Sequence, residues 1–197
     1  MPHWLRNNIW MRFARAELRV LRYAIWPPQP NTAPANGRSF FMTRDATQMA
    51  WAFVVIAVIE ALAFHLLFAA IGLKSLWLVL LLADIFIIYT VGVVRSLSRI
   101  AAVTLYEDGQ LIVRAGVLFQ METHIAQLSA VTNIPEIHPG QRVFKAALLS
   151  SPNCVLAFTS PQEAKLLSLV RLKRDAVTLK ITAPDDLRRL IAAQLAP

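Results

Sequence analysis

The sequence predicts two membrane-spanning helices in a hairpin, followed by a mainly-β domain that is capped by a C-terminal helix. Two apolar stretches, residues 46–71 and 76–94, are each long enough for the roughly 20 residues that a bilayer-spanning helix needs. Because only residues 72–75 separate them, we expect the two helices to be antiparallel. From Ala101 onward, short apolar runs are separated by turn residues, which is typical of strands.

Composition and charge narrow the class of protein. Hydrophobic residues make up 56% of the chain and charged residues 16%, against about 25% charged in soluble domains. Residues 1–47 carry seven arginines and two acidic residues, whereas residues 100–197 carry ten basic and eight acidic ones. A nucleic-acid-binding domain would carry its basic excess in the folded part, so we expect no nucleic-acid partner. Basic residues flank the outer ends of both apolar stretches, which predicts cytoplasmic termini and a lipid bilayer as partner.

The first 45 residues divide into a basic helix and a linker. Residues 1–25 have the period of an amphipathic helix that would lie on anionic lipid, and its basic face carries Arg12, Arg15, Arg19 and Arg22. The alternatives are a solvated helix that packs on the soluble domain and, less favoured, a mitochondrial transit peptide. Four prolines predict a semi-rigid linker over residues 26–45. The hairpin would then cover residues 46–99 and the mainly-β domain residues 100–197.

The mainly-β domain is predicted as a series of short strands and one helix. Strands are expected at residues 102–106, 111–114, 117–125, 131–134, 155–158 and 176–181. Asp108 and Gly109 signal the turn between the first two. Pro184 suits the first turn of the final helix, whose apolar face would carry Leu187, Leu190, Ile191 and Leu195.

Four polar residues lie inside the apolar stretches: Glu60, His65, Asp84 and Tyr89. Ionisable groups are expensive in hydrocarbon, so they are the first place to look for function. In an antiparallel hairpin with its turn at residues 73–74, His65 falls level with Asp84, and Glu60 falls level with Tyr89. Five residues correspond to a rotation of about 140° around a helix, so we expect one of these two layers to face out of the hairpin toward another subunit.

Three interpretations of this polar cluster are open. The side chains could pin the hairpin, or a dimer, through interhelical hydrogen bonds worth roughly 0.6–2 kcal/mol, which is the favoured interpretation. They could instead form a proton or ion relay. His65 could also bind a metal ion or a haem, since Ala61 leaves room for a ring one turn away.

No other pattern predicts catalysis or a cofactor. Cys154 is the only cysteine, and the sequence has neither a Gly-x-Ser-x-Gly motif nor a phosphate-cradling glycine-rich loop. Glu122 with His124, and Glu136 with His138, share a Glu-x-His pattern that would place each pair on one strand face and offer four ligands to zinc. Exposed polar positions explain these pairs more simply. We therefore expect no metal, no cofactor and no enzyme activity. A membrane-associated enzyme that uses the two Glu-x-His pairs is kept as the third hypothesis.

Residues 107–118 read EDGQLIVRAGVL, an acidic turn followed by an apolar-Arg-x-Gly strand pair. Together with IAQL at residues 125–128 and ITAPDDL at 181–187, this segment resembles bacterial PH-like domains that lie beside membrane helices. The hairpin, with IE at residues 59–60 and FHLL at 64–67, is similar to that of small bacterial membrane proteins that carry such a domain. The resemblance implies a small, strongly bent antiparallel barrel capped by one helix, at the bacterial inner membrane, and implies no particular activity.

The loop after the first strand departs from lipid-binding PH domains. Those domains typically carry basic residues there, whereas residues 107–109 are acidic, so we do not expect this loop to bind phosphoinositides. The densest basic cluster of the domain is Arg171, Lys173 and Arg174, which could contact lipid headgroups, although a solvated edge is the simpler explanation.

Two functions follow from these patterns. The favoured one is an inner-membrane binding or scaffold protein whose cytoplasmic PH-like domain binds a protein partner or forms a homo-oligomer. The alternative is a proton, ion or cofactor site in the membrane, built on the four polar residues of the hairpin.

Overall fold

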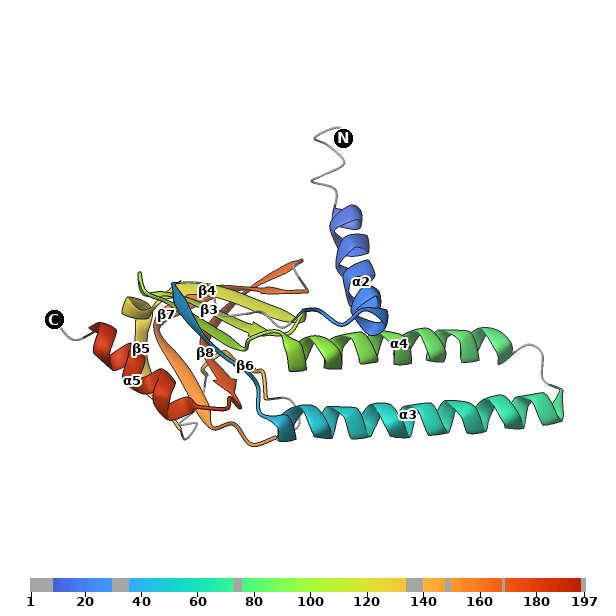
Figure 1. Cartoon of the computed structure of the whole chain (residues 1–197). Helices are drawn as coiled ribbons and strands as arrows, with labels where there is room; N and C mark the ends of the chain where they lie inside the picture. The colour runs from blue at the N-terminus through green and yellow to red at the C-terminus, as the bar shows by residue number, and fades with distance from the viewer. Residues whose placement is uncertain are drawn as a thin grey trace.

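The computed structural model describes residues 9–29, 36–72, 76–133, 140–147, 150–167 and 169–195. A long helical hairpin projects from a mainly-β domain, and an N-terminal helix meets one hairpin helix near that domain and projects away from it (Figure 1). The helices are α2 (Ile9–Ile25), α3 (Arg44–Ile71), α4 (Trp77–Arg99) and α5 (Pro184–Leu195). The strands are β1 (Gly37–Phe40), β2 (Val103–Tyr106), β3 (Gln110–Ala115), β4 (Phe119–His124), β5 (Leu128–Thr132), β6 (Val143–Lys145), β7 (Cys154–Leu166) and β8 (Val170–Leu179), with a short 3-10 turn η2 (Ile125–Gln127).

The two apolar helices α3 and α4 lie side by side and antiparallel, as predicted. Both are long and apolar enough to cross a membrane, and the rest of the chain covers little of either one. Exposed leucine, isoleucine, valine and phenylalanine side chains line their outer surfaces. A helix that is apolar all round needs an apolar environment, which the chain itself does not supply here.

The domain is built on one open sheet of eight strands. Their order is β1-β2-β3-β4-β7-β8-β6, with β5 added beside β7, and every pair is antiparallel except β6–β8. The long β7 pairs with β5 near its start and with β4 at its end, and a register shift divides it between Ala157 and Gln162. Such irregularities bend a sheet. The mainly-β class is therefore confirmed, but among the described residues the sheet is open rather than a closed barrel, because β1, β5 and β6 each pair along one side only.

Most predicted strands are present with shifted ends. The predicted hairpin is confirmed as β2 and β3, and Gly109 takes a φ of +80° in its turn. β5 begins at Leu128 rather than at residue 131. The strands predicted at 155–158 and 176–181 are only the inner halves of β7 and β8, whose outer halves form an unpredicted hairpin up to Leu166 and Val170. Those outer halves are rich in charged residues, so they lack the apolar signal on which strand prediction depends.

The core of the domain lies between the bent sheet and α5. Leu111, Phe119 and Leu156 are at most 1% exposed, and the ring of Phe119 stacks on Phe144. From α5, Leu187 and Ile191 are 0% and 3% exposed, whereas Leu195 is half exposed. The predicted helical cap is confirmed, and its apolar face covers the core over its first two turns.

The predicted linker over residues 26–45 is too long at its C-terminal end. Residues 37–40 form β1, which pairs with β2 at the edge of the sheet. Phe40 is 6% exposed and belongs to the core of the domain, so burial of this one aromatic ring draws the segment into the sheet. The sequence did not predict this strand, because four prolines dominate the residues before it and favour a linker.

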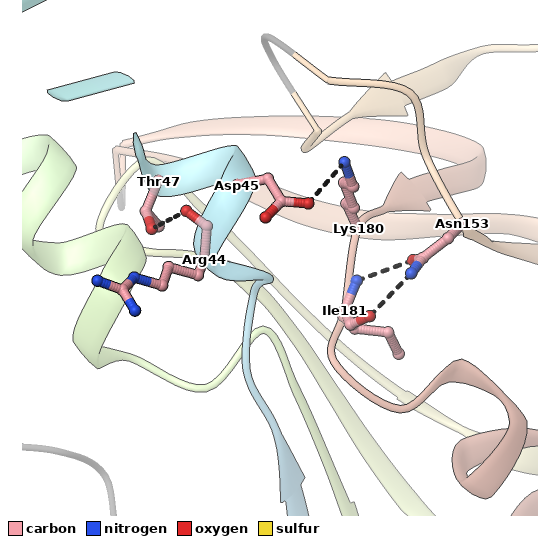
Figure 2. Close-up of polar contacts among 6 residues, drawn as sticks. All are labelled: Arg44, Asp45, Thr47, Asn153, Lys180 and Ile181. Carbon is pink, nitrogen blue, oxygen red and sulfur yellow. Dashed lines mark hydrogen bonds and ion pairs between the residues drawn. The ribbon is translucent and has the colours of Figure 1, made fainter. Parts of the chain in front are cut away.

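The start of α3 is tied directly to the sheet (Figure 2). The backbone N–H of Thr43 donates to the carbonyl of Lys180 at 3.0 Å, and Met42 forms an isolated β-bridge with Ile181. The side-chain amide of Asn153 brackets Ile181, accepting from its N–H at 2.9 Å and donating to its carbonyl at 2.8 Å. Lys180 also lies 3.5 Å from the carboxylate of Asp45 in the first turn of α3.

The end of α4 is tied to the sheet by Ser96. Its hydroxyl accepts from the backbone N–H of Val117 at 3.1 Å and donates to the carbonyl of Val93 at 2.7 Å. Gly116, with a φ of +53°, lies so close that a Cβ there would overlap the Ser96 hydroxyl. Ser96 is fully buried, and α4 runs into β2 within a few residues. Both hairpin helices therefore meet the domain through short, hydrogen-bonded junctions.

Helix α2 packs across α4 at one glycine. A Cβ at Gly92 would overlap the carbonyl oxygen of Val20, so glycine alone allows this approach, and Val20 is 1% exposed. The guanidinium of Arg95 donates to the carbonyl of Ala24 in the last turn of α2, where a cation stabilises unpaired carbonyls. The predicted N-terminal helix is present over Ile9–Ile25, and its predicted residues 1–8 lie outside the described part of the chain.

Candidate functional site

His65 and Asp84 meet between the hairpin helices, as their equal level predicts. Nε2 of His65 lies 3.3 Å from a carboxylate oxygen of Asp84. Nδ1 of the same ring lies 2.7 Å from the carbonyl oxygen of Ala61, one turn earlier on α3. The edge of the ring packs against Trp77 at the start of α4. One histidine thus links both helices near the closed end of the hairpin.

One contact of His65 fixes the position of its Nδ1 proton. A backbone carbonyl can only accept, so Nδ1 must carry a hydrogen and donate to Ala61. A hydrogen bond between Nε2 and Asp84 then needs one more proton, carried either by the imidazole or by the carboxyl. The contacts of His65 therefore join the two helices through a pair of ionisable side chains inside the apolar hairpin.

Glu60 and Tyr89 share a level but do not form a pair. Glu60 is exposed and has no hydrogen bond or ion pair to any residue that the structure describes. Tyr89 instead lies toward α2, within electrostatic range of Glu17. The predicted divergence of the two layers is therefore seen in this chain: one layer closes the hairpin and the other leaves Glu60 on its outer surface. The four residues do not form one cluster.

In His65 and His124, the two histidines that the structure describes, both ring nitrogens have protein partners. Both nitrogens of His65 have partners, as described above. In His124, Nδ1 accepts from the N–H of Ala126 at 3.2 Å, and Nε2 donates to the carbonyl of Asp108 at 2.9 Å. A Cβ at Gly109 would overlap the His124 ring, so the ring packs tightly on the predicted turn. His124 therefore fastens a turn and caps η2.

The structure describes only one of the two Glu-x-His pairs in the predicted four-ligand set. Glu122 is exposed and accepts from Gln120 at 2.7 Å, while Glu136 and His138 lie outside the described residues. Within the described ranges, no group of three or more His, Cys, Asp or Glu side chains is arranged to hold a metal ion. The third hypothesis, an enzyme built on these pairs, therefore stays a prediction, because two of its four residues lie outside the described ranges.

Cys154 is a core residue at the first position of β7. It is 1% exposed, and burial raises the pKa of its thiol to about 11, with Arg188 opposing this shift. Since the thiolate is the reactive form, this cysteine is poorly suited to nucleophilic chemistry.

The candidate lipid-contact residues divide by position. On α2, Arg15, Arg19 and Arg22 are exposed, and the side chain of Arg12 lies outside the description. On β8, strand alternation separates Arg171 and Lys173 from Arg174. Arg171 pairs with Glu163 at 3.2 Å, and Arg174 is half-buried with a hydrogen bond to the carbonyl of Lys173. The cluster on β8 is therefore not one continuous basic surface.

Comparison of the chain with protein-family models, with curated proteins and with solved structures finds no match. A functional proposal must therefore start from the geometry of the chain itself.

Proposed function

We propose that this chain is a binding or scaffold protein of the bacterial inner membrane, with no catalysis of its own. The hairpin of α3 and α4 spans the bilayer, and the cytoplasmic PH-like domain binds a protein partner or a second copy of the chain. The observation that carries this proposal is the pair of junctions that join both hairpin helices to the sheet. A domain tied at two points has a fixed height and orientation above the bilayer, which suits presentation of a surface.

The ends of the open sheet are the surfaces that we expect to bind. Among the described residues, β1 pairs with β2 alone and β6 pairs with β8 alone, so each leaves one side of its backbone unpaired there. Edge strands with free N–H and C=O groups bind extended segments of other chains by adding a strand. Lys145 on β6 and Arg38 on β1 are exposed. Charged side chains at an edge also limit uncontrolled pairing.

Photo-cross-linking from these edges tests the proposal. A photoreactive residue would replace Lys145 or Arg38 in the full chain in native membranes, with exposed Leu66 on α3 as the control position. We expect an edge position to yield a product of discrete mass, at twice the 22.0 kDa of one chain for self-association or at another fixed mass for a partner. Absence of any protein cross-link from either edge contradicts the proposal.

A second candidate function is a proton site in the membrane. The specific observation that favours it is the contact between two ionisable side chains, His65 and Asp84, inside the apolar hairpin. Reconstituted vesicles would report proton flux in the parent chain, in His65→Ala and in Asp84→Asn. Flux that both substitutions abolish supports this function, and equal flux in all three chains and in empty vesicles rules it out.

A further inference from the structure

We propose that a basic hollow between α2 and the sheet binds the phosphate of an anionic phospholipid headgroup. The hollow has a volume of about 930 Å³ and lies where the C-terminal end of α2, the end of α4 and strands β3, β4 and β7 meet. This inference rests on the proposed membrane anchoring, and it names a ligand for the same membrane face.

The walls of the hollow carry positive charge from both sides. Arg19 and Arg22 come from α2, Arg114 from β3 and Lys165 from β7. None of these four cations forms an ion pair or a side-chain hydrogen bond with any residue that the structure describes, and no described Asp or Glu lines the hollow. Glu122 and Glu163 lie beyond Lys165, in a smaller neighbouring hollow. Unpaired cations that converge from three elements are the recognition chemistry of a phosphate group.

The register of the sheet explains the basic floor. Arg114 of β3 lies opposite Gln120 of β4, and Gln120 lies opposite Lys165 of β7. Cross-strand partners point to the same face of a sheet. One face thus presents a row of donors, with the uncharged amide of Gln120 between two cations, toward the arginines of α2.

The position of the hollow favours a lipid over a soluble phosphate. Ile100, at the end of the apolar helix α4, lines it, so the hollow lies at the level where a bilayer-spanning α4 leaves the hydrocarbon. Tyr23 and Trp26 also line it, and such aromatic residues are typical of the headgroup region. On α2, Leu18 and Ile25 are 64% and 63% exposed and lie seven residues apart on one face, where they can contact acyl chains.

The hollow is held open by the fold. Gly92 and Arg95 fix α2 on α4, and Ser96 with Gly116 fixes the sheet on the same helix. The two walls therefore share α4 as a common support (Figure 1). A site that exists before binding needs little ordering of the protein when the ligand arrives.

Native mass spectrometry of the full chain, released from nanodiscs, tests the inference. The discs would contain equal amounts of phosphatidylglycerol and phosphatidylcholine, and a parallel sample in phosphatidylcholine alone would receive inorganic phosphate. The test variants are Arg114→Gln with Lys165→Gln, and Arg19→Gln with Arg22→Gln. The control is Arg142→Gln with Arg189→Gln, which removes two exposed charges of the domain outside the hollow. Flotation with phosphatidylcholine vesicles after a carbonate wash, and trypsin resistance, would establish insertion and folding of each chain.

We expect the parent and control chains to retain phosphatidylglycerol in preference to phosphatidylcholine. Each test variant should lose this preference by roughly 30-fold, the effect of two basic residues at a charged lipid surface. Equal retention in folded test and control variants overturns the inference and leaves the membrane anchor intact. Retention of inorganic phosphate in place of lipid overturns the lipid assignment. A parent chain that fails to float overturns the proposed anchoring and this site together.

Discussion

His65 contacts both hairpin helices, because its Nδ1 lies 2.7 Å from the Ala61 carbonyl oxygen and its Nε2 lies 3.3 Å from the Asp84 carboxylate. Asparagine at position 84 could donate its amide hydrogen to a neutral imidazole, whereas alanine would leave Nε2 without a partner. We therefore predict that Asp84→Asn unfolds close to the parent chain in detergent, and that Asp84→Ala is less stable by roughly 0.6–2 kcal/mol. Thermal unfolding followed by circular dichroism would measure both. Equal losses for the two variants would show that the side chains are not paired.

Cys154 gives a second prediction at the residue scale, from the raised pKa of its thiol. With a pKa of about 11 in place of the ordinary 9.0, the thiolate fraction at pH 8 falls by about 100-fold. The folded state favours the protonated thiol, so this contribution to stability is complete below the unfolded pKa and is lost as the pH rises through about 11. Alkylation of the native chain should accelerate about tenfold per pH unit up to that value. A native rate equal to that of the chain unfolded in detergent would contradict the burial of Cys154.

At the scale of elements, the junction of α4 with the sheet depends on one hydroxyl. Ser96→Ala leaves the partly buried N–H of Val117 without its acceptor, and an unsatisfied buried donor costs up to about 1–3 kcal/mol. Ser98→Ala is the matched control, since the exposed Ser98 hydroxyl bonds only the carbonyl of Arg95 within the same helix. We predict a lower midpoint of thermal unfolding for Ser96→Ala and no change for Ser98→Ala. The same midpoint for both would remove Ser96 from the account of the junction.

Some of the helices and strands can be predicted from the sequence, and others cannot. Hydropathy and length predict α3 and α4 because a long apolar run has few other solutions, and the turn at Gly109 marks β2 and β3. The outer halves of β7 and β8 pair with each other through backbone hydrogen bonds. Because this pairing does not need apolar side chains, their polar sequence does not predict a strand. β1 depends on a partner that lies more than sixty residues later, Val103 opposite Phe40. No local pattern encodes such a long-range pairing.

The candidate sites were also predictable from the sequence only in part. Position along an antiparallel hairpin predicts that His65 lies level with Asp84, and the two side chains do meet. Glu60 and Tyr89 are equally level but point in different directions, because rotation about the helix axis is set by packing, here by α2 on α4. The basic hollow was not predicted. Arg19, Arg22, Arg114 and Lys165 are far apart in sequence, and only the contact at Gly92 and the register of the sheet bring them together.

The whole molecule combines an apolar hairpin, a sheet domain tied to both hairpin helices, and a basic helix that packs on α4 beside the domain (Figure 1). If the hairpin spans the membrane, α2 lies across the hairpin axis near the level at which the helices enter the domain. Arg95 and Arg99 at the end of α4, and the arginines of α2, then lie on the same side as the sheet. In the sequence, Lys74 is the only basic residue between the two apolar helices. This asymmetry predicts a cytoplasmic domain.

Site-directed thiol labelling in intact bacterial cells tests this central claim most directly. Lys74→Cys places a thiol in the short link between the apolar helices, and Ser151→Cys places one in an exposed segment of the domain. The parent chain is the control, because the thiol of Cys154 is buried. A membrane-impermeant reagent should label Lys74→Cys in intact cells and Ser151→Cys only after lysis. Labelling of Ser151→Cys in intact cells, or protection of Lys74→Cys until lysis, would contradict a membrane-spanning hairpin with a cytoplasmic domain.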